Sequence, residues 1–283
     1  MTSSPHSYAT FLLRIVETIL AGGKTVSLFN LDYSLAPEAI FPTQIKQAGA
    51  CYSYLIEEMG IESEKIAMMG DSAGGHISLG MLCHLNQPMD GTAPKMEVEK
   101  PGIGLFLISP WVSLFSQDGY KEKEMSDLLS IEGLERWAKI VVGSKKPDEV
   151  EPYTEFVKRV KGRGRWKDIL PNRVWVSAGG DEMFSHNIGQ FVNALKEDGV
   201  DVEFVVQEGE AHDWQLAQAV GNEKKYLEGK FGDRDDGLLM GADRIGKAVL
   251  GETAINDVSP ATIKRVSTAR SGDSSLPPLI NLI

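Results

Sequence analysis

Apolar runs and segments of helical period alternate along this chain, as expected of a mostly parallel sheet covered by helices. Apolar residues recur at helical spacing over Tyr8–Leu20 and over Pro42–Met59, where Gly60 follows as a helix-ending glycine. Apolar and β-branched runs predict buried strands between the helices. These runs are Thr25–Asp32, Lys65–Met69, Gly102–Ile108, Val174–Ala178 and Val202–Gln207. The pattern predicts an α/β fold with a central, mostly parallel sheet.

Further helices are predicted at Ala73–Leu85, Ser130–Val142, Asn187–Glu197 and Gly237–Leu250. Residues 112–171 break the alternation, because they are charged and only partly helical, and they are predicted to form an insertion between two strands. The stretch 251–283 is rich in Ser, Thr, Pro and small residues, which predicts a disordered tail. We therefore expect one domain over 1–250, with the insertion at about 112–171, followed by the tail 251–283.

Composition narrows the classes of protein and of partner. The chain has 283 residues, 42% of them hydrophobic, which is enough for a large core. Its net charge of −11, from 40 acidic and 29 basic residues, argues against a nucleic-acid partner. No stretch of about eighteen apolar residues predicts a membrane span, and the first residues lack the features of a signal peptide. Cys51 and Cys83 are interpreted as reduced thiols, so a cytoplasmic location is expected; a homodimer is left open.

The most informative motif is Gly70-Asp-Ser72-Ala-Gly74. It matches the nucleophile-elbow pattern, in which a serine lies on a sharp turn between a strand and a helix. The strand-like run before it and the helix-like run after it supply that setting. The glycine positions are expected to be small because the turn leaves no room for side chains. Ser72 is therefore the candidate nucleophile, against the alternative of a glycine-rich structural turn.

A serine hydroxyl needs a neighbouring base, and the base needs an orienting acid. In hydrolases with this elbow the order is serine, acid, histidine, each after a strand. Asp181 follows the predicted strand Val174–Ala178, and His212 follows Val202–Gln207. The spacings are 109 residues (181 − 72) and 31 residues (212 − 181). The second interval has room for one helix and one strand, so Asp181 and His212 are the candidate acid and base.

Alternatives exist for both partners of the serine. Glu182 adjoins Asp181 and is a rival for the orienting acid, although Asp181 lies nearer the double glycine. Asp213 adjoins His212 and is expected to help start the next helix. The other histidines are interpreted as surface, packing or helix-start residues; they are His6, His76, His84 and His186. Only His212 follows a late strand in a turn.

Other chemistries have little support in the sequence. Gly102-Ile-Gly104 has no third glycine and does not form a dinucleotide fingerprint. The chain contains neither Cys-x-x-Cys nor His-Glu-x-x-His, so no metal site is predicted. We expect no cofactor and no metal.

Three stretches together resemble the hormone-sensitive-lipase branch of the α/β-hydrolases, a group of carboxylesterases and acetyl-ester hydrolases. Asp32-Tyr-Ser-Leu-Ala-Pro-Glu38 is similar to the family's Asp-Tyr-Arg-Leu-Ala-Pro-Glu, with Ser34 replacing the arginine. Gly70-Asp-Ser-Ala-Gly-Gly75 matches the elbow of the Gly-Asp-Ser-Ala-Gly subgroup. Gly209-Glu-Ala-His-Asp-Trp214 resembles the family's histidine segment. The resemblance covers residues from about 5 to 250.

The resemblance implies further parts of a site. Segment 112–171 corresponds to part of the family's cap, and Trp111 is implied to line the acyl pocket. Met183 and Trp214, which adjoin the acid and the base, are further pocket candidates. The residue after the nucleophile, Ala73, is implied to contribute its backbone N–H to the oxyanion hole.

One family motif has no counterpart in this chain. The family carries His-Gly-Gly-Gly, whose glycine N–H groups bind the oxyanion, in the loop after its third strand. Residues Met1–Tyr8 resemble the continuation of that motif, and everything upstream, including the first three strands, has no counterpart. The third strand would lie between Thr25–Asp32 and Lys65–Met69, so we expect a gap with two rows of unpaired backbone groups. The sequence is then either part of a longer protein or a shortened protein that has lost hydrolytic power.

These observations predict a serine carboxylesterase that acts through an acyl-enzyme on small to medium, apolar or acetylated esters, such as an acetylated natural product or sterol. The alternative is a catalytically impaired or non-catalytic binding protein on the same fold, which the absent oxyanion loop favours.

Overall fold

The computed structural model describes residues 5–88, 93–158, 160, 163–230, 237–252 and 279–282. Within these ranges, six parallel strands form one sheet in the order β1-β6-β2-β3-β4-β5. The strands are β1 (Leu28–Asn30), β2 (Ile66–Asp71), β3 (Gly104–Ile108), β4 (Arg173–Gly179), β5 (Asp201–Gln207) and β6 (Leu279–Leu282). The predicted α/β class with a parallel sheet is confirmed.

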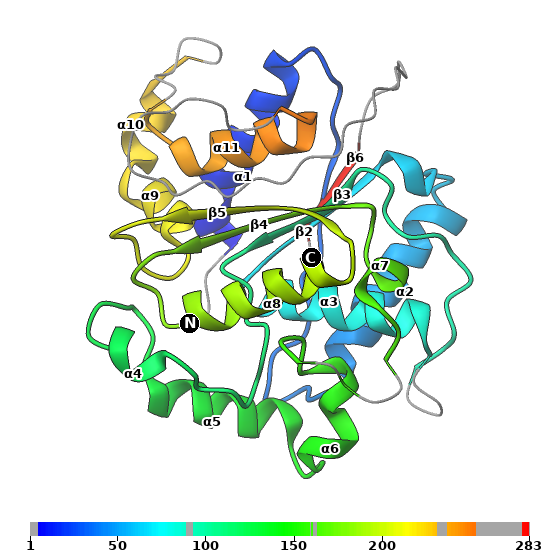
Figure 1. The fold of residues 1–283 in the computed structure, drawn as a ribbon. Helices are drawn as coiled ribbons and strands as arrows, with labels where there is room; N and C mark the ends of the chain where they lie inside the picture. Colours follow the sequence, from blue (N-terminus) through cyan, green and yellow to red (C-terminus); the bar gives the residue numbers. More distant parts are fainter. Residues whose placement is uncertain are drawn as a thin grey trace.

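Helices cover both faces of the sheet (Figure 1). One face carries α1 (Pro5–Ala21), α9 (Trp214–Gly221), α10 (Glu223–Glu228) and α11 (Met240–Leu250). The other carries α2 (Thr43–Glu57), α3 (Ser72–Asn86), α7 (Trp166–Ile169) and α8 (Ser185–Glu197), and the short η1 (Ser63–Lys65) leads into β2. The bounds of α1, α2, α3, α8 and α11 agree with predicted helices to within a few residues, whereas α7, α9 and α10 were not predicted.

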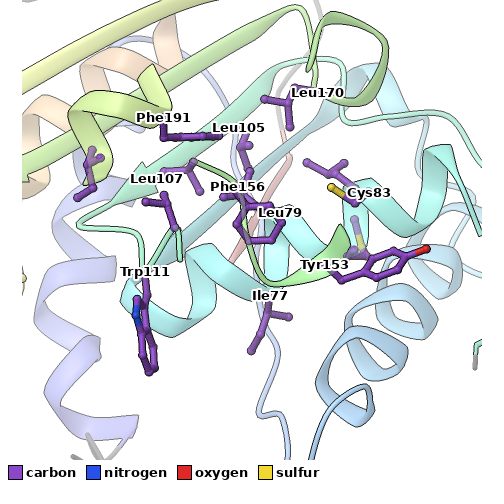
Figure 2. Packing of buried hydrophobic residues seen from close by; sticks show 14 of the residues in the cluster. Ile77, Leu79, Cys83, Leu105, Leu107, Trp111, Tyr153, Phe156, Leu170 and Phe191 are labelled. Atoms are coloured by element: carbon purple, nitrogen blue, oxygen red, sulfur yellow. The ribbon is translucent and has the colours of Figure 1, made fainter. Parts of the chain in front are cut away.

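The alternation of side chains along each strand divides the core into two clusters. Met68 of β2 and Leu105 and Leu107 of β3 belong to the cluster on the α3 side, whereas Met69 and Phe106 belong to the α1 side. Figure 2 shows the α3-side cluster, with Trp111 at one end and Tyr153 and Cys83 at the other. Trp111 lies in the loop just after the carboxyl end of β3, so this core extends to the edge of the sheet where the candidate site residues lie.

The first predicted strand is shorter and more exposed than expected. Thr25–Asp32 was predicted as a buried strand, but only Leu28–Asn30 form β1, and Leu28 is 40% exposed. Among the described strands, β1 stands at the edge of the sheet and pairs only with β6. Val26 and Leu31 of this run are partly buried and pack against opposite core clusters, so the apolar run reflects partial and not full burial.

Part of the predicted tail forms a strand inside the sheet. Residues 253–278 and 283 lie outside the described residues, but Leu279–Leu282 form β6, which corrects the prediction of a disordered tail for these four residues. Strand β6 runs parallel between β1 and β2, with Ile280 opposite both Leu28 and Ala67. It occupies the position where a gap was expected, so β1 and β2 both have a hydrogen-bonding neighbour.

The insertion lies between β3 and β4, as predicted. It contains α4 (Tyr120–Lys123), α5 (Ile131–Val142), α6 (Pro147–Val150), η2 (Glu151–Tyr153) and α7. Ser113 and Glu155 join its two ends through an isolated antiparallel bridge, and Ser113 Oγ donates to Glu155 Oε2 at 2.5 Å. Helices α4, α5 and α6 lie below α8 and α3 in Figure 1, away from the sheet.

None of the helices in the described ranges is long and apolar enough to cross a membrane.

Candidate active site

Ser72 lies on the turn between β2 and α3, with a left-handed backbone (φ 49°) that is unusual for a residue with a side chain. A Cβ placed on Gly70 would lie 2.6 Å from backbone atoms of Gly74 and Gly75, so the predicted need for a small residue is confirmed at Gly70. A Cβ on Gly75 would lie 2.9 Å from Pro110 Cβ. This strained, crowded turn is the geometry of a nucleophile elbow.

The structure brings the predicted base to the serine. His212 Nε2 is 2.9 Å from Ser72 Oγ, although 140 residues separate the two in the sequence. His212 follows β5, and its ring is buried. A serine hydroxyl and an imidazole at this distance can exchange a proton.

The orienting acid expected for His212 does not bind it in the structure. Asp181 Oδ1 lies 3.1 Å from Lys123 Nζ, and its side chain is 41% exposed. His212 Nδ1 is buried and has no hydrogen-bond partner among the described residues, so the expected bond to Asp181 is absent. The lysine of the insertion holds the Asp181 carboxylate instead.

Its neighbour, Glu182, lies in the interior. Glu182 Oε2 accepts from Ser109 Oγ at 2.6 Å and from the Gly179 N–H at 2.7 Å. Its other oxygen, Oε1, is buried without a partner in the described part of the chain, as His212 Nδ1 is. Burial raises the pKa of Glu182 to about 8, while His212 acts in the opposite direction. Glu182 is therefore a buried acid close enough to His212 to affect its charge.

Asp213 contacts the same imidazole nitrogen as the serine. Asp213 Oδ2 lies 3.2 Å from His212 Nε2, and Asp213 has a left-handed backbone (φ 53°). As predicted, Asp213 stands at the start of α9, where it is the N-cap residue and its carbonyl accepts from the Leu216 and Ala217 N–H groups, but its side chain makes no cap hydrogen bond. Burial lowers the pKa of His212, but the carboxylates of Asp213, Glu182 and Asp127 outweigh burial and raise it to about 9.

A further carboxyl group, that of Asp71, adjoins the serine in sequence. Tyr8 Oη donates to Asp71 Oδ2 at 2.8 Å, which ties α1 to the elbow. Burial and the charge of Asp213 raise the pKa of Asp71 to about 7. The Ser72 hydroxyl is therefore set among ionisable groups whose pKa values fall near neutral pH.

The backbone around Ser72 offers a candidate oxyanion donor. Ala73 is the second residue of α3, so its N–H is one of the first-turn groups that have no acceptor within a helix. The Ser72 carbonyl accepts from the Trp111 N–H at 3.0 Å, which fixes the elbow against the loop after β3. The position of Ala73 is compatible with the role implied by the family resemblance.

Aromatic side chains pack against the histidine. Phe184 meets the His212 ring edge to face at 5.0 Å and stacks on Trp111 at 5.9 Å. Met183 is fully buried in the core, and Trp214 is buried with its indole N–H lacking a partner among the described residues. Of the three pocket candidates, Trp111 is thus linked to His212 through Phe184.

The other histidines whose side chains are described contact groups other than the Ser72 hydroxyl. His76 Nδ1 is 2.7 Å from the Trp111 carbonyl, and His84 Nε2 is 2.8 Å from the Pro94 carbonyl. His186 is exposed on α8 and contacts Gln190. The side chain of His6 lies outside the described part. The packing and helix-start interpretations hold for the three that are described.

Sequence reasoning missed two residues of the site, Ser109 and Asp127. Ser109 Oγ donates to Glu182 and accepts from the Asp213 N–H at 3.2 Å, and its backbone is left-handed (φ 43°). Asp127 accepts backbone hydrogen bonds from Met183 and His212. The position of Ser109 just after a buried strand is a signal that could have identified it, whereas Asp127 lies in an irregular stretch with no such signal.

A parallel sheet flanked by helices, with a serine on a strained strand-to-helix turn and a histidine within hydrogen-bond distance, defines the class of α/β hydrolases. The sequence model of a protein family described as having the α/β-hydrolase fold matches residues 4–216 of this chain. The chain belongs to this α/β-hydrolase family.

The chain is also similar in sequence to individual proteins that are named as an esterase, an acetyl hydrolase and a lipase. An esterase of Acinetobacter venetianus is 27% identical over 208 residues, which is 73% of this chain and 63% of that protein. Steryl acetyl hydrolase 1 of Saccharomyces cerevisiae is 28% identical over 153 residues, 51% of this chain and 34% of the relative. The mouse hormone-sensitive lipase is 39% identical over 57 residues, 19% of this chain and 8% of the lipase. The chain thus spans less than two thirds of the length of these relatives.

Solved structures agree on the fold. A hormone-sensitive lipase from a metagenome library superposes with a TM-score of 0.64 at 21% identity, covering 89% of this chain and 74% of that one. An esterase of the bacterial hormone-sensitive lipase family gives a TM-score of 0.59 at 24% identity, covering 78% and 64%. At these identities the likeness concerns the fold.

Proposed function

We propose that this protein is a serine carboxylesterase. The observation that carries the proposal is the 2.9 Å contact between Ser72 Oγ and His212 Nε2 at a strained elbow. The similarity to an esterase, a steryl acetyl hydrolase and a hormone-sensitive lipase supports an ester as the substrate.

In the proposed mechanism, neutral His212 accepts the Ser72 hydroxyl proton through Nε2 as Oγ attacks the ester carbonyl. The Ala73 N–H stabilises the tetrahedral oxyanion. Protonated His212 then gives its proton to the leaving alcohol, and an acyl-enzyme remains. Water, deprotonated by His212, attacks the acyl-enzyme and releases the acid, which restores Ser72.

We assign the orienting acid to Glu182, with Asp181 as the alternative. Buried Glu182 has an unpartnered oxygen and a charge that raises the pKa of His212, whereas the Asp181 carboxylate is engaged by Lys123. A carboxylate facing His212 Nδ1 would hold the tautomer in which Nε2 accepts the serine proton.

The test is hydrolysis of p-nitrophenyl acetate by the wild type and Ser72→Ala. Activity that disappears in Ser72→Ala supports the proposal, and equal rates in the two contradict it. Glu182→Gln is expected to lower kcat by about 10⁴-fold, the cost in a comparable triad of replacing the orienting acid by an amide, which favours the wrong imidazole tautomer. Asp181→Asn is the matched comparison, and a larger loss there than in Glu182→Gln would assign the acid to Asp181.

A non-catalytic binding protein is the second candidate. The chain contains no His-Gly-Gly-Gly, and the loss of one oxyanion donor costs about 2.7–4 kcal/mol of transition-state stabilisation. This candidate predicts that the wild type binds esters without turning them over, and that Ser72→Ala leaves the binding unchanged. A p-nitrophenyl phosphonate ester separates the two, because an activated serine forms an Oγ–P bond with release of p-nitrophenol. A phosphonate adduct found by mass spectrometry on the wild type and not on Ser72→Ala supports the esterase, and no adduct on the wild type supports the binding protein.

The residues around His212 also bear on the substrate. We propose small to medium, apolar or acetylated esters, because the buried rings of Phe184 and Trp111 make the surroundings of His212 apolar and because the relatives include a steryl acetyl hydrolase. A cytoplasmic location and a homodimer stay proposals, to be tested by fractionation and by analytical ultracentrifugation.

A further inference from the structure

A short segment of the insertion contacts both loops that carry the candidate acid and base. We define Lys123–Asp127 as the latch segment. Lys123 Nζ lies 3.1 Å from Asp181 Oδ1, and Ser126 Oγ donates to the Asp181 carbonyl oxygen at 3.0 Å. The latch segment thus holds the loop after β4 at two points.

Asp127 extends the contact to the histidine loop. Its Oδ2 accepts the Met183 N–H at 2.7 Å, and its Oδ1 accepts the His212 N–H at 3.1 Å. Oδ1 also accepts the N–H of the next residue, Leu128, at 2.6 Å, which orients the carboxylate within its own turn. One half-buried carboxylate therefore bridges the loops after β4 and β5.

We propose that Asp127 is a positioning residue that sets His212 relative to Ser72 by joining the acid loop to the base loop. The proposal rests on the proposed esterase function for its kinetic consequence, but its structural content does not.

The chemistry of the bridge requires a carboxylate. Its two oxygens accept from two backbone N–H groups on different loops, and an ionised acceptor makes a stronger bond than a neutral one. An asparagine retains one acceptor oxygen, so it can satisfy only one loop, and its NH₂ group would face an N–H donor. The other N–H would be buried without an acceptor, which costs free energy and so favours a displaced position of its loop.

The charge of Asp127 acts on the same imidazole. Carboxylates from four elements affect His212, namely Asp213, Glu182, Asp127 and Asp71. Removal of the Asp127 charge is therefore expected to lower the pKa of His212, while the other three carboxylates remain.

The kinetic test compares Asp127→Asn with Glu122→Gln, which removes an exposed carboxylate from α4 without touching either loop. Asp127→Asn is expected to lower kcat by about 10²-fold, as small misplacements of catalytic groups do, with KM changed less than about twofold. Its pH profile is expected to rise at lower pH than that of the wild type. Glu122→Gln is expected to match the wild type in both respects.

The second test does not need turnover. NMR titration of ¹⁵N-labelled histidine follows His212 in the wild type and in both variants, and hydrogen exchange follows the Met183 and His212 amides. Asp127→Asn is expected to lower the His212 titration midpoint and to speed exchange at one or both amides. If the wild type shows no Ser72-dependent hydrolysis, the proposed function fails and this test still decides the role of Asp127.

Two outcomes would overturn the proposal. In the first, Asp127→Asn and Glu122→Gln have the same kcat, the same His212 titration midpoint and the same amide exchange rates. The other is a loss of kcat that is fully accounted for by a lower melting temperature and an unfolded fraction, with an unchanged His212 titration.

Discussion

At the scale of single residues, the charge around His212 decides when it can act as a base. Asp213 contacts the nitrogen that must accept the serine proton, and it stabilises the protonated imidazole. With a pKa of about 9, His212 is mostly protonated at neutral pH. The proposed base is therefore suited to mildly alkaline conditions.

We accordingly expect the acid limb of kcat/KM for wild-type ester hydrolysis to have its midpoint near pH 9. A raised pKa of the base moves the limb to higher pH, so Asp213→Asn, which removes the strongest raising charge, is expected to move it to lower pH. Glu182, Asp127 and Asp71 continue to face His212 in this variant. The pH dependence of kcat/KM, measured for the wild type and for Asp213→Asn, gives the shift.

The control for this prediction is Asp148→Asn, which removes an exposed carboxylate from α6. It is expected to leave the limb where it is in the wild type. A limb in Asp213→Asn that stays at the wild-type position would contradict the role assigned to Asp213.

Residue types and their order were enough to predict Ser72 and His212, because the elbow motif and a histidine after a late strand are local patterns. They were not enough to choose between Asp181 and Glu182. Neighbouring residues on one turn point in different directions, and the choice depends on Lys123 and Ser109, which come from other parts of the chain.

At the scale of elements, the elbow depends on close approach between β2 and the first turn of α3. The space at Gly70 is filled by the backbone of Gly74 and Gly75, which cannot give way as a flexible side chain would. Ser72 keeps its position on the turn, facing His212, only while β2 and the first turn of α3 stay this close.

Gly70→Ala is therefore expected to lower the free energy of unfolding by about 1–3 kcal/mol or more, as overpacking does, and to abolish Ser72-dependent activity. The matched control is Gly189→Ala within α8, where an added Cβ would meet no atom within 4 Å. That variant is expected to gain about 0.4–1 kcal/mol. Chemical denaturation of both measures the difference, and equal effects would show that space at the elbow is not limiting.

At the scale of the whole molecule, strand β6 completes the sheet. The segment that fills the position between β1 and β2 comes from the far end of the sequence, after residues 253–278. An interior strand satisfies backbone groups on both of its neighbours, so the adjoining strands β1 and β2 depend on its N–H and C=O groups.

Ile280→Pro is expected to destabilise the protein, because proline removes a backbone N–H and is poorly tolerated inside a sheet. A buried unsatisfied group costs about 1–3 kcal/mol, and each kcal/mol corresponds to about 2–4 °C in melting temperature for a chain of this size. Ile280→Val, which keeps the N–H, is the control. Thermal melts that coincide for the two variants would argue against an interior position for β6.

The sequence by itself determined the alternation of strands and helices, the serine at its elbow, the histidine after the last predicted strand and the insertion between two strands. These features depend on periodicity and on motifs that a few neighbouring residues define. Only the tertiary structure decided that β6 lies between β1 and β2, that Asp181 turns to Lys123 while Glu182 is buried, and that Asp127 bridges the two loops. Each of these depends on partners distant in the sequence, because strand pairing and burial are properties of neighbours in space that no local pattern records.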